Sequence, residues 1–215
     1  MNGYGNRVRL GAIALGVAGL LFVLYPAVRP WKDESTAEGA QAAMSSAAWV
    51  AAHLFAIIGF ILVPLGLLAV WAVLARSAVE RLAFGAVVIT WIGVGLTLPY
   101  YGAEDFALNA IASKATQGQS LDLLDLVDAI RYHPVGGTMF ILGLLALGAG
   151  AVLAATCVWR SGTLPRYSGV PMAVGFALFI PQFFAPGGIR IAHGVLLGAG
   201  LVWLALVLWR VEAHT

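Results

Sequence analysis

The sequence predicts an all-α, polytopic membrane protein with six transmembrane helices. Of its 215 residues, 61% are hydrophobic and only 10% are charged, whereas an average soluble protein has roughly 25% charged residues. The mean hydropathy is +0.91. So few charges cannot cover a water-exposed surface, which excludes a soluble domain, a disordered chain and a nucleic-acid-binding protein. The single cysteine, Cys157, excludes a disulfide framework.

Six apolar stretches approach or exceed the roughly 20 residues that a membrane-spanning helix needs. They cover 10–28, 47–74, 82–101, 135–159, 169–186 and 189–209, and we expect them to form a single membrane domain over 1–215. The first stretch follows Arg7 and Arg9, as in a signal peptide, but no convincing small-residue cleavage site comes after it. We therefore expect an uncleaved first helix.

The polar segment 102–133 separates the third expected helix from the fourth. It is interrupted near 117–120, where we expect Ser120 to cap a short helix that carries Asp122, Asp125 and Asp128 on one face. A second polar segment, 29–46, has few apolar side chains to anchor it, and we expect it to be mobile.

Glycines recur at short intervals in the third and fourth expected helices. They are Gly93, Gly95, Gly143, Gly148 and Gly150. Small residues at such spacings let helices approach each other closely in membranes. We therefore interpret these glycines as helix-packing positions.

The distribution of basic residues predicts the orientation through the positive-inside rule. If the N-terminus is cytoplasmic, seven basic residues lie inside and five outside, while eight of the ten acidic residues lie outside. We predict that both termini are cytoplasmic. The excess of Ala, Gly, Val and Leu is typical of a chain from a high-GC bacterium, so the expected location is the bacterial inner membrane.

Three of the four histidines are expected at one depth, near the outer surface. His53 lies about two turns into the second helix, His133 opens the fourth and His193 lies about one turn into the sixth. Because these helices run in the same direction, the three imidazoles fall within roughly 10 Å in depth. His214, near the C-terminus, is not expected to take part.

Other polar side chains reach the same level. They are Glu104, Asp105, Arg131, Tyr132, Gln182 and Arg190. Ionisable groups at membrane depth are costly and usually mark a functional site. The alternative is that Arg131 and Arg190 pair with Glu104 and Asp105 and only lock helix ends together.

The first functional hypothesis is a haem b site with a redox or sensing role. His53 and His193 would be the axial ligands, Arg131 and Arg190 would bind the propionates, and Tyr132 would line the pocket. This hypothesis implies an electron-transfer partner.

Two alternatives remain open. His53, His133 and His193 would bind zinc or copper, with Glu104 and Asp105 as catalytic carboxylates of a membrane hydrolase that acts on a lipid substrate. Alternatively, the same groups would relay protons in a small proton-coupled transporter, although the predicted polar residues cluster at one side rather than at the midplane. The sequence leaves enzymatic activity and homo-oligomerisation open.

Overall fold

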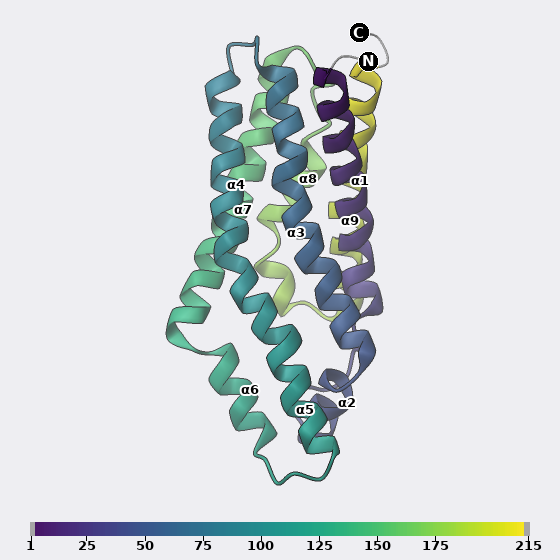
Figure 1. The fold of residues 1–215 in the computed structure, drawn as a ribbon, viewed down its shortest axis with the longest axis vertical. Helices are drawn as coiled ribbons and strands as arrows, with labels where there is room; N and C mark the ends of the chain where they lie inside the picture. The colour runs from purple at the N-terminus through teal and green to yellow at the C-terminus, as the bar shows by residue number, and fades with distance from the viewer. Residues whose placement is uncertain (1–2, 213–215) are drawn as a thin grey trace.

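The computed structural model describes residues 3–212, and all regular secondary structure in that range is helical (Figure 1). Five of its helical stretches have the length and apolar composition to cross a membrane. They contain α1 (Gly3–Val28), α3 (Ala47–Leu74), α4 (Glu80–Gly102), α7 (Pro134–Ser161) and α9 (Gly187–Glu212). The bounds of α3 match the prediction. His214 lies outside the described residues.

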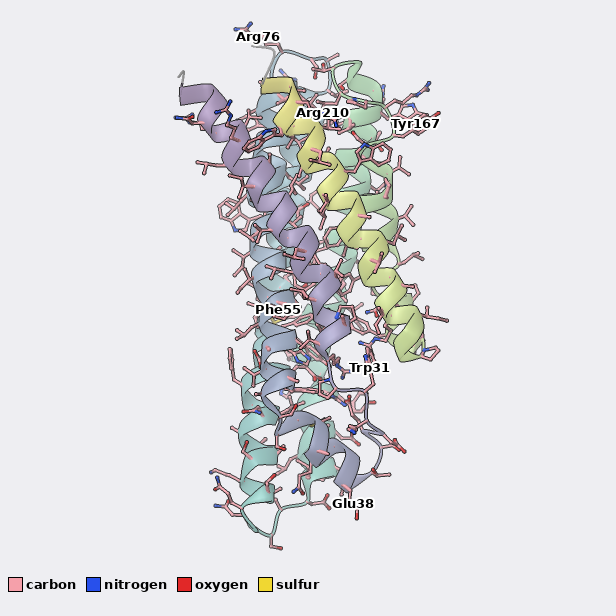
Figure 2. The ribbon with its side chains drawn as sticks, turned by 90° about the vertical axis from the view of Figure 1, so that its right-hand side faces the viewer. Trp31, Glu38, Phe55, Arg76, Tyr167 and Arg210 are labelled. Atoms are coloured by element: carbon pink, nitrogen blue, oxygen red, sulfur yellow. The ribbon has the colours of Figure 1, made fainter. Side chains whose placement is uncertain are left out.

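The long helices form one bundle. Helix α1 packs between α3 and α9, α4 packs on α7, and α3 joins the two groups through its contact with α4. Helix α1 begins and α9 ends at the same end of the bundle (Figure 1). Arg76 and Arg210 lie at that end as well (Figure 2). This arrangement agrees with termini that share one side of the membrane, while their assignment to the cytoplasm stays a prediction.

The sixth expected span, 169–186, is not confirmed as a membrane-spanning helix. It contains the eight-residue helix α8 (Val170–Ala177), a turn, and the 3-10 helix η2 (Pro181–Phe184). The α-helical hydrogen bonds stop before Pro181. The Phe179 N–H bonds the Phe176 carbonyl at 3.2 Å, and the Gly175 carbonyl that it would reach in an α-helix lies 2.7 Å from His193 Nε2. Pro181 then removes one further N–H donor. Helix α8 packs against α7 and α9, and this broken segment leads the chain back between two helices that run in the same direction (Figure 1).

Three short helices extend beyond the opposite end of the bundle. They are α2 (Ala37–Met44), α5 (Leu108–Thr116) and α6 (Leu123–Arg131) (Figure 1). Helix α5 continues α4 through the π-helix η1 (Ala103–Ala107), so helical structure runs well past the expected end at residue 101. A separate small core holds the short helices together. It consists of Ala40, Ala43, Met44, Trp49, Leu108, Ala112, Leu123 and Val127.

Two expectations about these polar segments change. The segment 29–46 is not poor in apolar anchors, because three residues of α2 are buried in the small core. The cap of α6 is Asp122 rather than Ser120. The Asp122 side chain accepts a hydrogen bond from the Asp125 backbone N–H at 3.2 Å, and Asp is as effective a cap as Ser.

Glycines allow α4 and α7 to approach closely, as expected. A Cβ atom added at Gly93 would lie 2.8 Å from the carbonyl oxygen of Gly143. Cβ atoms added at Gly143 and Gly150 would collide with threonines of α4. Gly95 differs, because an added Cβ there meets nothing within 4 Å.

Gly93→Ala should therefore destabilise the bundle, by about 1–3 kcal/mol, because it overpacks a close helix contact. The matched control Gly95→Ala should be neutral or stabilising by up to about 1 kcal/mol, since alanine favours helix. Thermal unfolding of both variants in mild detergent, followed by circular dichroism, checks this. Equal unfolding temperatures for the two variants would contradict the close contact of α4 with α7 at Gly93.

Candidate functional site

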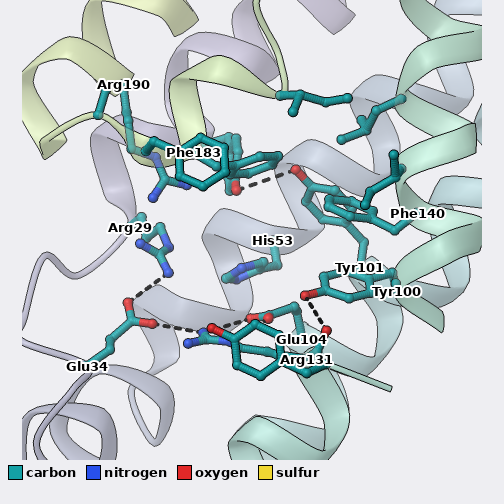
Figure 3. A pocket seen from close by; sticks show the side chains of 18 of the residues that line it. Arg29, Glu34, His53, Tyr100, Tyr101, Glu104, Arg131, Phe140, Phe183 and Arg190 are labelled. Atoms are coloured by element: carbon teal, nitrogen blue, oxygen red, sulfur yellow. Dashed lines mark hydrogen bonds and ion pairs between the residues drawn. The ribbon is translucent and has the colours of Figure 1, made fainter. Parts of the chain in front are cut away.

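A cavity of about 800 Å³ lies where α1 ends and α7 and α9 begin. This volume is typical of sites that bind small molecules. Aromatic side chains form much of the wall (Figure 3). They include Tyr25, Trp31, Tyr100, Tyr101, Tyr132, Phe140, Phe183 and Phe184. Four basic residues line it against two acidic ones, so the cavity carries excess positive charge. The six are Arg29, Lys32, Arg131, Arg190, Glu34 and Glu104.

A chain of ion pairs crosses one side of the cavity (Figure 3). Arg131, at the end of α6, contacts Glu104 of η1 through two hydrogen bonds of 2.7 and 3.0 Å. The same guanidinium bonds Glu34 at 2.8 Å, and Glu34 bonds Arg29 at 2.7 Å. The four side chains are largely buried. These contacts join three regions that are distant in sequence: the segment that follows α1, η1 and the end of α6.

Arg131 stays charged in this environment. Burial alone would lower the pKa of its guanidinium, but the hydrogen bonds and ion pairs with Glu104 and Glu34 outweigh that effect and raise the pKa. The pairing of Arg131 with Glu104 agrees with the structural alternative considered from the sequence. Arg190 does not agree with that alternative, because it bonds Gln182 rather than a carboxylate.

Arg29 and Arg190 keep hydrogen-bonding capacity that the protein does not use. Their guanidinium carbons lie 5.1 and 5.0 Å from the ring centroid of Trp31. Arg190 donates to the Gln182 side-chain oxygen at 3.1 Å but has no carboxylate partner within residues 3–212. The Nε atom of Arg29 and the Nε2 atom of Gln182 are buried, and neither has a hydrogen-bond partner in that range. Unused donors therefore gather around Trp31 and Arg190.

His53 lies in the wall of the cavity and is 3% exposed. Its Nδ1 atom is 2.8 Å from the Trp49 carbonyl oxygen. A carbonyl oxygen only accepts hydrogen bonds, so Nδ1 carries the hydrogen and Nε2 keeps its lone pair. The ring packs among Tyr25, Trp49 and Tyr101. Histidines that bind metals or haem iron commonly donate their other ring N–H to a carbonyl oxygen in this way.

The other two histidines are held differently. His133 also lines the cavity, but its Nδ1 atom accepts the Gly136 N–H at 3.3 Å and caps α7. His193 does not line this cavity. It borders a neighbouring small pocket, where its Nε2 atom lies 2.7 Å from the Gly175 carbonyl oxygen. Within the described range, no group of three or more His, Cys, Asp or Glu side chains is placed to hold a metal ion.

The two predicted catalytic carboxylates do not lie in the same site. Glu104 lines the cavity, whereas Asp105 does not and is fully buried elsewhere. Both carboxylate oxygens of Asp105 lack a hydrogen-bond partner in the part of the chain that the structure describes. A catalytic role for either residue stays a prediction.

Besides His133, five other residues that the sequence places in the same layer line the cavity. They are His53, Glu104, Arg131, Tyr132 and Arg190. Sequence reasoning missed Arg29, Trp31 and Glu34, which follow directly after α1. The available signal was two basic residues and a tryptophan at the end of a span, where aromatic and basic residues favour the membrane interface.

Comparison of the chain with models of protein families, with curated proteins and with solved structures finds no match. The function is therefore inferred from the site itself.

The bond between Arg131 and Glu104 should contribute measurably to stability. In a double-mutant cycle with Arg131→Gln and Glu104→Gln, we expect a coupling energy of about 1–3 kcal/mol, because the pair is bidentate and mostly buried. Thermal unfolding or denaturant titration in detergent measures it. Lys114→Gln, on the exposed part of α5, is the control. A coupling energy near zero would show that this pair does not hold α6 to η1.

Proposed function

We propose that this chain is an integral membrane protein that binds an anionic amphiphile from one side of the membrane. The observation that carries the proposal is a pair of cavity-lining arginines with unused donors. The Nε atom of Arg29 is buried without a hydrogen-bond partner in the described residues, and Arg190 bonds only the Gln182 side chain there. Buried donors are costly when they lack a partner. The oxygens of a carboxylate, sulfonate or phosphate would satisfy them, and positive charge around the cavity would favour such a group.

The rest of the cavity suits an apolar or aromatic body. Tyr100 stacks on Phe140 with ring centroids 4.1 Å apart, and Phe140 contacts Phe183 at 5.7 Å. Such a wall excludes water and buries the apolar part of a ligand, while the arginines contact its anionic end. The proposed ligand is therefore amphiphilic rather than a simple ion.

Binding is supported better than transport. In the described part of the chain, the buried polar residues outside this end of the bundle are Thr90, Thr97 and Ser168. None of these is ionisable, and Thr97 donates to a carbonyl of its own helix. A proton-coupled carrier would need polar groups near the midplane. The proton-coupled transporter remains the alternative proposal.

A fluorescent fatty acid, dansyl-aminoundecanoic acid, tests the binding proposal. We expect saturable binding to the detergent-solubilised protein and an affinity at least about tenfold lower for Arg190→Gln, since a hydrogen bond to a charged group contributes about 1.5–3 kcal/mol. Arg76→Gln, at the other end of the bundle, should bind like the original protein. Equal binding of the uncharged methyl ester, or no effect of Arg190→Gln, would contradict the proposal.

Haem b is the candidate ligand that a specific feature favours. It is a planar dianionic amphiphile, and the free Nε2 atom of His53 in the cavity fits one axial position. Bound haem would supply redox or gas-sensing chemistry. Arg29 and Arg190 would bind the propionates, because Arg131 is already paired with Glu34 and Glu104. His193 lines a different pocket, so the cavity favours a single histidine ligand over the predicted pair.

Haemin titration separates this candidate from other amphiphiles. We expect a shifted Soret band, with sharpened α and β bands after dithionite if a strong-field sixth ligand such as imidazole is added. His53→Ala should abolish the shift, whereas His193→Ala should retain it. Absence of a Soret shift, or equal loss in both variants, would reject His53-ligated haem. Elemental analysis of the same sample tests the zinc and copper alternative.

A further inference from the structure

The cavity wall continues to the outer surface of the helix bundle. Ile141 of α7 and Phe184 of η2 both line the cavity, and they are 51% and 88% exposed. They lie on two segments that meet beside it through the contact of Phe140 with Phe183. On a membrane-spanning bundle, exposed apolar side chains of this kind contact lipid tails rather than water. The cavity therefore has an apolar edge on the side of the bilayer.

The charged end of the cavity lies at the boundary between the apolar spans and the polar segments, where a bilayer has its headgroups. Its arginines and Trp31 surround the points where α1 ends and α9 begins, which is where the apolar spans meet the polar segments. Tryptophan and tyrosine are enriched at this level in membrane proteins. Basic pockets between transmembrane helices bind anionic lipid headgroups.

From these two observations we propose that the ligand is an anionic membrane lipid, which enters sideways from the bilayer between the start of α7 and the segment 180–187. The proposal rests on the proposed function and names its ligand class. The phosphate accepts hydrogen bonds from Arg29 and Arg190, beside Trp31. One acyl chain lies along Phe140 and Phe183, and the remaining lipid stays in the bilayer beside Ile141 and Phe184.

The break in the sixth expected span makes this route available. A continuous helix over 169–186 would place a regular helical wall beside α7. Instead, the α-helix ends at Ala177, and η2 leads to the start of α9. Phe183 then contacts Phe140 and lies 5.3 Å from the Arg190 guanidinium, while Phe184 is directed outward. The same short segment thus contributes to the headgroup site and to the lipid-facing edge.

Native mass spectrometry tests the lipid class on the full chain. Protein released from nanodiscs with equal amounts of phosphatidylglycerol and phosphatidylcholine should retain phosphatidylglycerol at least tenfold more often. The variant Arg29→Gln/Arg190→Gln should lose this preference, and Arg76→Gln should keep it. If phosphatidylglycerol is not preferred while the dansyl fatty acid still binds, the lipid proposal is overturned and the binding proposal stands. Loss of both kinds of binding overturns both proposals.

Two measurements on the unmodified protein test the route and the source of the anion. A phosphatidylglycerol with a diazirine in one acyl chain should label peptides that contain residues 134–144 and 180–187. Labelling confined to other lipid-facing positions, such as Leu10 or Trp91, would overturn lateral entry. Displacement of the retained lipid by millimolar glycerol 3-phosphate would show that a free phosphate is sufficient, and would also overturn the proposal.

Discussion

The ion-pair chain from Arg29 through Glu34 and Arg131 to Glu104 is the interaction on which the site depends. It joins the end of α1, the following segment, η1 and the end of α6. Without it, the small core of α2, α5 and α6 would have no charged connection to the cavity in the described structure. Buried ion pairs carry a large desolvation cost, and all four carboxylate oxygens of Glu34 and Glu104 accept a hydrogen bond from an arginine.

The same chain determines what remains for a ligand. Both carboxylates that line the cavity are consumed by Arg29 and Arg131, so neither neutralises Arg190. Arg190, which bonds only the Gln182 side chain among the described residues, and the unpartnered Nε atom of Arg29 therefore keep donors for a ligand. We propose that this positive charge beside an aromatic wall binds an anionic amphiphile. The free Nε2 atom of His53 adds the possibility of an axial ligand, which haem b would use and a lipid would not.

Hydropathy was sufficient for the all-helical class and for the positions of five apolar helices, because a spanning helix must be apolar over its whole length. It failed at the sixth span, since apolar composition does not report the local loss of α-helical hydrogen bonds between Phe179 and Pro181. Helix direction predicted a common depth for the polar residues, and this stays a prediction. It did not predict which of them converge: His193 and Asp105 lie outside the cavity, because hydropathy does not fix rotation about a helix axis. Glu34 was missed because its partner Arg131 is 97 residues away in sequence, and Arg29 joins the ion-pair chain only through Glu34.

A structure determined experimentally in nanodiscs that contain an anionic phospholipid would test the central claim most directly. The account predicts elongated density in the cavity, with its polar end on the Arg29 and Arg190 guanidinium groups and its tail along Phe140 and Phe183 toward the bilayer. A cavity that holds only water, or an Arg190 that pairs with a carboxylate of the chain itself, would contradict it.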